Sequence, residues 1–361
     1  MTKRTTMTAG ELAKLLSPFK VLANKHALSA LYKTLEIGPT IIRGMSSYAQ
    51  LEVDVDLAIE QNCFVDALVF MSIVESLNPS NVLVLKQTEN TLEWKCGHAK
   101  GKLALVIMDA MPAIKRGRMK QGAWTPPDMF VPALELGSLS CDSDTLASIG
   151  MYGIVLDNRK DLSIFSSDNT TISACRVQKA TVPNMPDMVT LPPDGARLLA
   201  NVVSRHQGSI QFTDTDLFFA GDVVRLVVKQ STPLKADIAA ILSKFTKRKK
   251  IVAIPPARIA AFIRRVNVIA DTKNDAHVAL TISDGKVALA FEEGTASSDE
   301  YYMVEALEQT EEMEAIKLSA SKMARAMAHV DSMVLDHAER FVITLRGSSP
   351  LFHYLISGRK V

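Results

Sequence analysis

The stretch DGARLLANVVSRH, residues 194–206, has the spacing of an amphipathic helix, and SIQFTDTDLFFAG, residues 209–221, reads as a β-hairpin before a further strand. The same order recurs in residues 66–96 and 319–347. The three copies begin at Asp66, Asp194 and Ser319, so they are 128 and then 125 residues apart. One supersecondary unit at a domain-sized period predicts three similar domains in series.

A second helix-and-strands pattern precedes each of these units. Its third instance follows residues 255–256 and places four apolar residues on one helix face: Ile259, Phe262, Ile263 and Val266. Strands are expected next, at residues 277–283 and 286–294, with a turn at Asp284 and Gly285. The other two instances begin at Glu11 and Cys141. Each domain is therefore expected to have two halves, which gives six pseudo-repeats.

Breaker residues and basic runs mark the expected domain boundaries. Residues 115–127 end in a double proline and residues 245–250 are mostly basic, so both are expected to be linkers. Pro18 is expected to kink or shorten the helix that begins at Glu11. The predicted fold class is α+β, each domain having two helices on antiparallel sheets, with domains at residues 1–122, 123–250 and 251–361.

The composition is that of an ordinary globular chain. Of its 361 residues, 47% are hydrophobic, which is enough for a core in each domain, and the formal net charge is only +2. The four cysteines are far apart and form no CxxC pair, so neither a metal site nor a disulfide framework is expected. No apolar run is long enough to span a bilayer, and residues 1–10 lack the apolar core of a signal peptide. A cytoplasmic protein without a membrane partner is expected.

The polar faces of several predicted helices carry basic residues with few carboxylates. Solvated helix faces are usually charged, so a single helix says little, but repetition across domains favours a surface that faces phosphates. The helices expected from Asp66 and Cys141 carry no basic residue and weaken the pattern. The basic residues expected to face nucleic acid are Lys14, Lys20, Lys25, Arg197, Arg205, Arg258, Arg265, Lys322 and Arg325.

Three longer stretches give a family resemblance. GMYGIVLDNRKDLSIFSSDNTTIS, residues 150–173, has a Gly-hydrophobic strand that leads to a turn at residues 167–172. VVRLVVKQSTPLKADIAAIL, residues 223–242, has an Arg-Leu strand followed by Pro233, and IPPARIAAFIRRVNVIADTK occupies residues 254–273. In order and spacing, from about Thr6 to Val361, the chain resembles the bacterial DNA polymerase β sliding clamp family, including its phage-encoded relatives.

The resemblance implies a head-to-tail homodimeric ring of six domains, with helices lining a hole for double-stranded DNA. Such a clamp is not an enzyme and needs no cofactor or metal, because it tethers the polymerase and so gives processivity. Its expected partners are DNA without sequence preference, and polymerase and clamp-loader subunits that bring short hydrophobic peptides. Its expected location is the cytoplasm, on the nucleoid.

Residue by residue, the resemblance also implies a partner-peptide pocket and a dimer seam. The pocket would contain Met151, Ser167, Asn169, Ile172, Pro233, Ile241 and Arg359. Ser167 and Asn169 replace the family's threonine and glycine, and the usual Met-Pro-x-Arg tail is replaced by residues 356–361. The seam would join the edge strand at Leu103 and Leu105 to Val268 and Ile269.

Two alternatives to a clamp belong to other classes of protein. An enzyme is disfavoured because the chain has no GxxxxGK[ST], GxGxxG, GxSxG or HExxH motif. A structural adaptor with clamp-like domains, which binds partner peptides without encircling DNA, stays open on sequence alone. Charge reversal at Lys25, Arg197 and Arg265 would separate the two, because only a clamp depends on these charges to load or slide.

Overall fold

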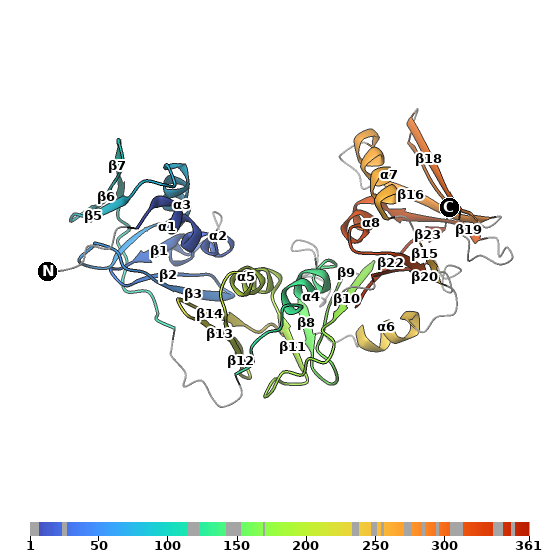
Figure 1. The fold of residues 1–361 in the computed structure, drawn as a ribbon, viewed down its shortest axis with the longest axis horizontal. Helices are drawn as coiled ribbons and strands as arrows, with labels where there is room; N and C mark the ends of the chain where they lie inside the picture. The colour runs from blue at the N-terminus through green and yellow to red at the C-terminus, as the bar shows by residue number, and fades with distance from the viewer. Residues whose placement is uncertain are drawn as a thin grey trace. The chain divides into compact units, whose positions relative to one another are not determined.

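The computed structural model describes residues 7–23, 27–114, 123–141, 153–168, 170–232, 238–246, 251–253, 256–270, 276–283, 286–293, 296–303, 313–334, 342–347 and 351–360. The chain divides into two compact units (Figure 1). The first comprises Met1–Pro127, Val182–Pro186 and Asp194–Ser231, and the second comprises Asp128–Thr181, Asp187–Pro193 and Thr232–Val361.

The first unit is built on a seven-stranded antiparallel sheet in the order β12-β13-β14-β3-β2-β1-β4. Its strands are β1 (Thr34–Ile37), β2 (Ile41–Met45), β3 (Ala49–Asp54), β4 (Cys63–Asp66), β12 (Gly208–Phe212), β13 (Asp216–Gly221) and β14 (Val224–Lys229). A three-stranded sheet follows the order of β5 (Leu83–Gln87), β6 (Thr91–Cys96) and β7 (Ala99–Ala104). The helices are α1 (Ala9–Leu16), α2 (Phe19–Leu22), a 3-10 turn (Ala30–Lys33), α3 (Ala67–Ser76) and α5 (Pro193–Val203).

Local sequence accounts for where these helices begin and end. The Thr8 hydroxyl accepts a hydrogen bond from the Glu11 N–H at 3.2 Å, and the Glu11 carboxylate accepts one from the Thr8 N–H at 2.8 Å, which forms a capping box for α1. Pro18 follows the end of α1 and precedes α2, as expected for a residue that cannot continue a helix. The Asp66 carboxylate caps α3 by accepting from the Val69 N–H at 2.9 Å.

The second unit holds two further antiparallel sheets. The eight-stranded sheet has the order β11-β8-β9-β10-β22-β21-β20-β15 and the five-stranded sheet has the order β18-β17-β16-β19-β23. The strands of the former are β8 (Ile154–Asp157), β9 (Ser163–Asp168), β10 (Thr171–Arg176), β11 (Met188–Leu191), β15 (Ile251–Ala253), β20 (Ser332–Val334), β21 (Val342–Gly347) and β22 (Leu351–Ser357). Those of the latter are β16 (His277–Ser283), β17 (Lys286–Glu293), β18 (Ala296–Met303), β19 (Met313–Ser319) and β23 (Arg359–Lys360). The helices are α4 (Phe130–Gly137), α6 (Ile238–Thr246), α7 (Pro256–Ile269) and α8 (Ala320–Met327).

The predicted helix, hairpin and further strand are confirmed in all three copies. They correspond to α3 with β5, β6 and β7, to α5 with β12, β13 and β14, and to α8 with β20, β21 and β22. The apolar faces of these amphipathic helices are buried: Leu198 and Val202 are fully buried on α5, and Met323 and Ala326 are at most 2% exposed on α8. The hydrophobic periodicity of these segments therefore identified both the elements and their core faces.

The second pattern is found at α1 and at α7, whereas the helix expected from Cys141 falls almost wholly outside the described residues and stays a prediction. A helix, α4, lies upstream of Cys141 and packs on β9 and β10, whereas residues 142–152 lie outside the described part of the chain. Pro132 is in the first turn of α4, where its missing N–H has no helical partner to lose. Because Pro132 follows soon after Pro126 and Pro127, the sequence of this segment does not predict a helix.

Sheets join segments that the sequence places in different predicted domains. Leu226 on β14 pairs with Leu51 on β3, and Ala174 on β10 pairs with His353 on β22. The halves of the expected middle domain, residues 123–250, thus contribute to different sheets and to different compact units. The three-domain division stays a prediction. Among the described residues, no helix is both long enough and apolar enough to cross a membrane.

Candidate functional site

One face of the eight-stranded sheet carries two of the residues expected in a peptide pocket. Side chains two positions apart along a strand share a face, and paired residues on adjacent strands lie side by side. Ile172 on β10 pairs with Ser167 on β9 and with Leu355 on β22, and Leu355 pairs with Thr344 on β21. These four residues form a first row across the sheet.

The next row on the same face is more apolar at one end and basic at the other. Two residues along each strand, Phe165 pairs with Ala174, Ala174 with His353, and His353 with Arg346. Val155 on β8 pairs with Phe165 at the other end of the row. A third row contains Ser163, Arg176 and Leu351, which pair in the same way.

Helix α6 packs against the apolar part of this face. Val155, Phe165 and Ala174 form a buried cluster, and Ile172, Met188 and Leu242 pack around it while partly exposed. Leu242 comes from α6, so the helix forms one wall of a groove whose floor is the sheet. Ile241, also on α6, is half-buried.

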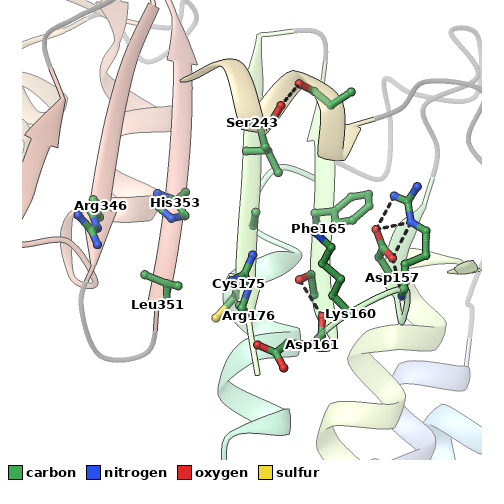
Figure 2. Close-up of a pocket in the computed structure, with 15 residues that line it drawn as sticks. Asp157, Lys160, Asp161, Phe165, Cys175, Arg176, Ser243, Arg346, Leu351 and His353 are labelled. Atoms are coloured by element: carbon green, nitrogen blue, oxygen red, sulfur yellow. Dashed lines mark hydrogen bonds and ion pairs between the residues drawn. The ribbon is translucent and has the colours of Figure 1, made fainter. Parts of the chain in front are cut away.

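The groove opens into a cavity of about 650 Å³ below α6 (Figure 2). This volume lies within the range of protein sites for small ligands and peptide side chains. Figure 2 shows Ser243 of α6 above the strands, Phe165 on the sheet, and Arg346 and His353 on the side of β21 and β22. The cavity is lined by Asp157, Arg159, Lys160, Asp161, Ser163, Phe165, Ala174, Cys175, Arg176, Ala240, Leu242, Ser243, Arg346, Leu351 and His353.

A tight turn next to the first row is held by Asp168. Its carboxylate accepts hydrogen bonds from the backbone N–H groups of Thr170 and Thr171 at 3.1 and 2.7 Å. The Lys322 ammonium on α8 lies 3.2 Å from the same carboxylate and also contacts the Thr170 hydroxyl. The Ser167 hydroxyl donates to the Thr171 carbonyl at 3.0 Å. This turn, which borders the groove, is therefore fixed from within and from a helix far along the sequence.

The cysteine in the cavity lining and the arrangement of possible metal ligands describe what the cavity offers chemically. Burial raises the pKa of the Cys175 thiol to about 12, against a smaller opposing effect of the Arg176 N–H, so the thiol is protonated at neutral pH. Within the described part of the chain, no three His, Cys, Asp or Glu side chains are grouped so that they could hold a metal ion.

The other residues expected in the pocket are placed only in part. Met151, Asn169 and Pro233 lie outside the described residues. Arg359 is exposed on β23, where it pairs with Lys317 of β19 in the five-stranded sheet. Of the predicted set, the structure brings together Ser167 and Ile172 on one row, with Ile241 on the helix that covers it.

Most of the basic residues expected to face DNA are exposed. Lys20 pairs with Glu75 at 2.6 Å, Arg197 pairs with Asp194 at 3.0 Å, and the Arg265 guanidinium lies 5.7 Å from the centre of the Phe262 ring. Arg205 donates to the Ser17 hydroxyl at 2.6 Å, while Lys322 and Arg325 are half-buried. The exposed residues are Lys14, Lys20, Arg197, Arg205, Arg258 and Arg265, and Lys25 lies outside the described residues.

The expected dimer seam involves a strand at the end of a sheet. β7 lies at one end of the three-stranded sheet, with Leu103 on it and Leu105 just beyond it, both half-buried. Val268 on α7 is 83% exposed. Ile269 ends α7, and its side chain lies outside the described residues.

The basic end of the groove was not identified from the sequence, although a signal for it exists. Strict alternation along β10 places Arg176 on the same face as Ile172 and Ala174. Arg346 could not be found in this way, because its place beside the groove depends on the pairing of β21 with β22 and of β22 with β10.

The arrangement of these sheets and helices is that of the bacterial sliding-clamp fold, a mixed α/β fold with antiparallel sheets. The solved structures that share it include the DNA polymerase III subunit beta from Pseudomonas aeruginosa, with a TM-score of 0.78 and 15% identity over 99% of each chain. The Thermotoga maritima beta subunit gives a TM-score of 0.80 at 12% identity, again over 99% of each chain. The sliding clamp of Bartonella birtlesii bound to griselimycin gives 0.80 at 14% identity, with the same coverage. The sequence matches no protein-family model and none of the curated proteins.

Proposed function

We propose that this protein is a DNA sliding clamp, a processivity factor that encircles duplex DNA and tethers the replicative polymerase. The observation that carries the proposal is the clamp fold over 99% of the chain, aligned with 99% of the solved beta subunits. A clamp performs no reaction itself. It keeps the polymerase near the template, so that rebinding is intramolecular and occurs at a high effective concentration.

Exposed cations on several helices support a surface for the phosphate backbone. Arg197 and Arg205 extend from the α5 region in the first unit, and Arg258 and Arg265 extend from α7 in the second. Contacts with phosphates attract DNA of any sequence, since they read no base edges. This sequence-independent attraction is what a protein that slides along DNA requires.

The groove beside α6 supports the binding of partner peptides. It combines the apolar side chains of Ile172, Phe165 and Leu242 with polar groups along its edge, as sites for short peptides commonly do. Polymerase and clamp-loader subunits are the partners that this role requires. Two copies of the chain, joined head to tail along β7 and the end of α7, would form the ring.

Retention on closed DNA tests the proposal most directly. The protein, loaded on nicked circular plasmid, is expected to stay bound at about 1 M salt, where contacts with phosphates alone are screened. Cutting the plasmid once with a restriction enzyme should release it, because a ring slides off a free end. Equal loss from circular and linear DNA at this salt concentration would refute the clamp.

Charge-reversal variants distinguish the clamp from a clamp-like adaptor. Arg197→Glu combined with Arg265→Glu should reduce retention on the circle severalfold or more, because phosphate attraction becomes repulsion. Glu60→Lys, a reversal of an exposed charge on a loop, is the matched control and should leave retention unchanged. An adaptor would bind its peptides normally in all variants and would show no topological retention.

A further inference from the structure

The cavity below α6 has an apolar floor and an excess of positive charge around it. The apolar side chains come from Phe165, Ala174, Leu242 and Leu351. Of the described residues that line the cavity, four are lysines or arginines, Arg159, Lys160, Arg176 and Arg346, against the two carboxylates Asp157 and Asp161. The cavity therefore offers an apolar surface on its floor and mainly positive charge around it.

The charges of Asp157 and Arg159 already neutralise each other within the protein. Asp157 accepts hydrogen bonds from the Arg159 side chain at 3.0 Å from Nε and 2.6 Å from Nη2, and from its backbone N–H at 3.0 Å. Although burial opposes it, this set of contacts holds the pKa of Asp157 below its ordinary value. Among the described residues that line the cavity, the pair leaves Lys160, Arg176 and Arg346 with one further carboxylate, Asp161.

These three cations have no carboxylate partner among the described residues. Arg176 and Lys160 are exposed, and Arg346 is half-buried beside His353, so their charge is available to a ligand. They come from β10, from the turn between β8 and β9, and from β21. Cations that converge on one cavity from three separate segments favour an anionic group within it.

The basic cavity is continuous with the groove. Ile172, Ala174 and Arg176 succeed one another on one face of β10, and the side chains of Ile172 and Ala174 belong to one hydrophobic cluster. Consecutive rows along a strand are about 7 Å apart, which is the reach of two residues of an extended peptide. An extended chain that places apolar side chains on the partly exposed Ile172 and Leu242 would therefore carry its next residues to Arg176.

We infer that this cavity is a second subsite of the peptide groove and selects partner segments in which acidic side chains flank the apolar anchor residues. The inference rests on the proposed role of the groove and names the partner chemistry that it favours. The occupant is a peptide rather than a nucleic acid, because the floor is formed by apolar side chains that suit leucine or phenylalanine better than a sugar-phosphate chain.

A pair of capped, fluorescein-labelled peptides tests the inference. Both contain Leu-Val-Leu-Phe, one flanked on each side by Asp-Glu and the other by Asn-Gln, and both have blocked termini. In fluorescence anisotropy at about 50 mM salt, the acidic peptide should bind about five- to tenfold more tightly to the wild-type protein. The preference should shrink as salt is raised.

Charge-reversal variants test which side chains cause the preference for the acidic peptide. Arg176→Glu with Lys160→Glu should abolish or invert it, while the Asn-Gln peptide still binds about as in the wild type, which also shows that the groove is folded. Arg264→Glu changes an exposed charge on α7, away from the cavity, and should keep the preference. A single-stranded oligonucleotide of thymidines should not compete with the acidic peptide.

Several outcomes would overturn the inference. Equal binding of the two peptides to the wild type, or a preference unchanged in Arg176→Glu with Lys160→Glu, would remove the acidic subsite and leave the apolar groove intact. Displacement of the acidic peptide by the oligonucleotide would reassign the cavity to nucleic acid. Retention on circular DNA is measured without peptides, so failure of the clamp proposal is recognised separately.

Discussion

Glu52 on β3 is 2% exposed and joins arginines from two other strands. Its carboxylate lies 2.9 Å from the Arg43 side chain on β2 and 3.3 Å from that of Arg225 on β14, and it accepts from the Ile114 N–H at 2.8 Å. Arg225 also contacts Asp54, and Arg43 reaches Glu36 at 3.4 Å. A buried carboxylate of this kind is favourable only because every partner is present.

Removing the Glu52 charge should therefore destabilise the first unit. Glu52→Gln keeps the size of the side chain but leaves two largely buried guanidinium groups with less compensation, so we expect a loss of about 2 kcal/mol in the free energy of unfolding. Urea unfolding followed by circular dichroism measures it. Glu60→Gln on an exposed loop is the control and should change stability by less than about 0.5 kcal/mol. An equal unfolding midpoint for the two variants would contradict this account of Glu52.

His206 gives a prediction that depends on pH. Partial burial, together with the positive charge of Arg205, lowers the pKa of His206, while Asp222 opposes the change. Because the folded-state pKa lies below the ordinary value of about 6.5, the unfolded chain binds this proton more readily. The stabilisation from neutral His206 is thus complete above about pH 6.5 and is lost as pH falls toward the folded-state pKa.

NMR titration of the His206 ring protons measures this shift. Arg205→Gln removes a repelling charge and should raise the pKa of His206 toward its ordinary value, whereas Asp222→Asn should lower it further. Opposite directions from two neighbouring substitutions exclude a general change in the fold. If both variants shift the pKa in the same direction, the assigned electrostatic causes are wrong.

At the scale of single elements, α3 depends on one side chain for its beginning. Asp66 accepts from the Val69 N–H at 2.9 Å, and α3 then buries Ala67, Phe70, Met71 and Val74. Asp66→Ala leaves an N–H of the first turn without this acceptor, so we expect a loss of about 1 kcal/mol in the free energy of unfolding. Asp66→Asn should retain most of the stability, because asparagine is also a good N-cap. Urea unfolding of the three proteins tests the cap, and equal destabilisation by Ala and Asn would disprove it.

The sequence predicted those elements whose periodicity is undisturbed. α5 and α8 were predicted as helices because their apolar residues, among them Leu198, Val202, Met323 and Ala326, follow the helical repeat without interruption. α4 and α6 were missed, since Pro132 interrupts the former and the short apolar run of the latter precedes a basic segment. Helix and strand patterns depend on the spacing of nearby residues, so a single sequence is enough to predict them.

The groove was only partly predictable for a related reason. Ser167 and Ile172 follow from a local resemblance, and the turn between their strands brings them together. Lys322 contacts Asp168 although 154 residues separate them, and nothing in a single sequence reports such a pairing. Lys322 was expected to face DNA, and its role there stays a prediction, with its ammonium here engaged by a carboxylate.

At the scale of the whole molecule, a net charge of +2 conceals local separation of charge. Exposed cations on α5 and α7, and the cations of the cavity below α6, are set against acidic groups that are held in ion pairs within sheets, such as Glu52 and Asp157. Carboxylates that are neutralised internally contribute little to the field at the surface. A chain with balanced composition can therefore present the local positive surfaces that the proposed binding of DNA and of acidic peptides requires.

Ring closure requires that the chain associate with a second copy, and two positions test the expected seam. Leu103 lies half-buried on the end strand β7 and Val268 is 83% exposed on α7, so both side chains are accessible to a second copy. Leu103→Asp combined with Val268→Asp would place a carboxylate on each side of a buried seam, and we expect dimerisation to weaken about a hundredfold or more. Light scattering should then give 39.4 kDa for the variant and twice that mass for the wild type.

The same variant should lose retention on circular plasmid at high salt, because an open or monomeric clamp is not linked topologically to the DNA. Val84→Asp, on β5 at the other end of the same sheet and also exposed, is the matched control and should remain dimeric. A double variant that remains dimeric would place the seam elsewhere, and a wild-type protein that is monomeric at micromolar concentration would rule out a ring of two chains.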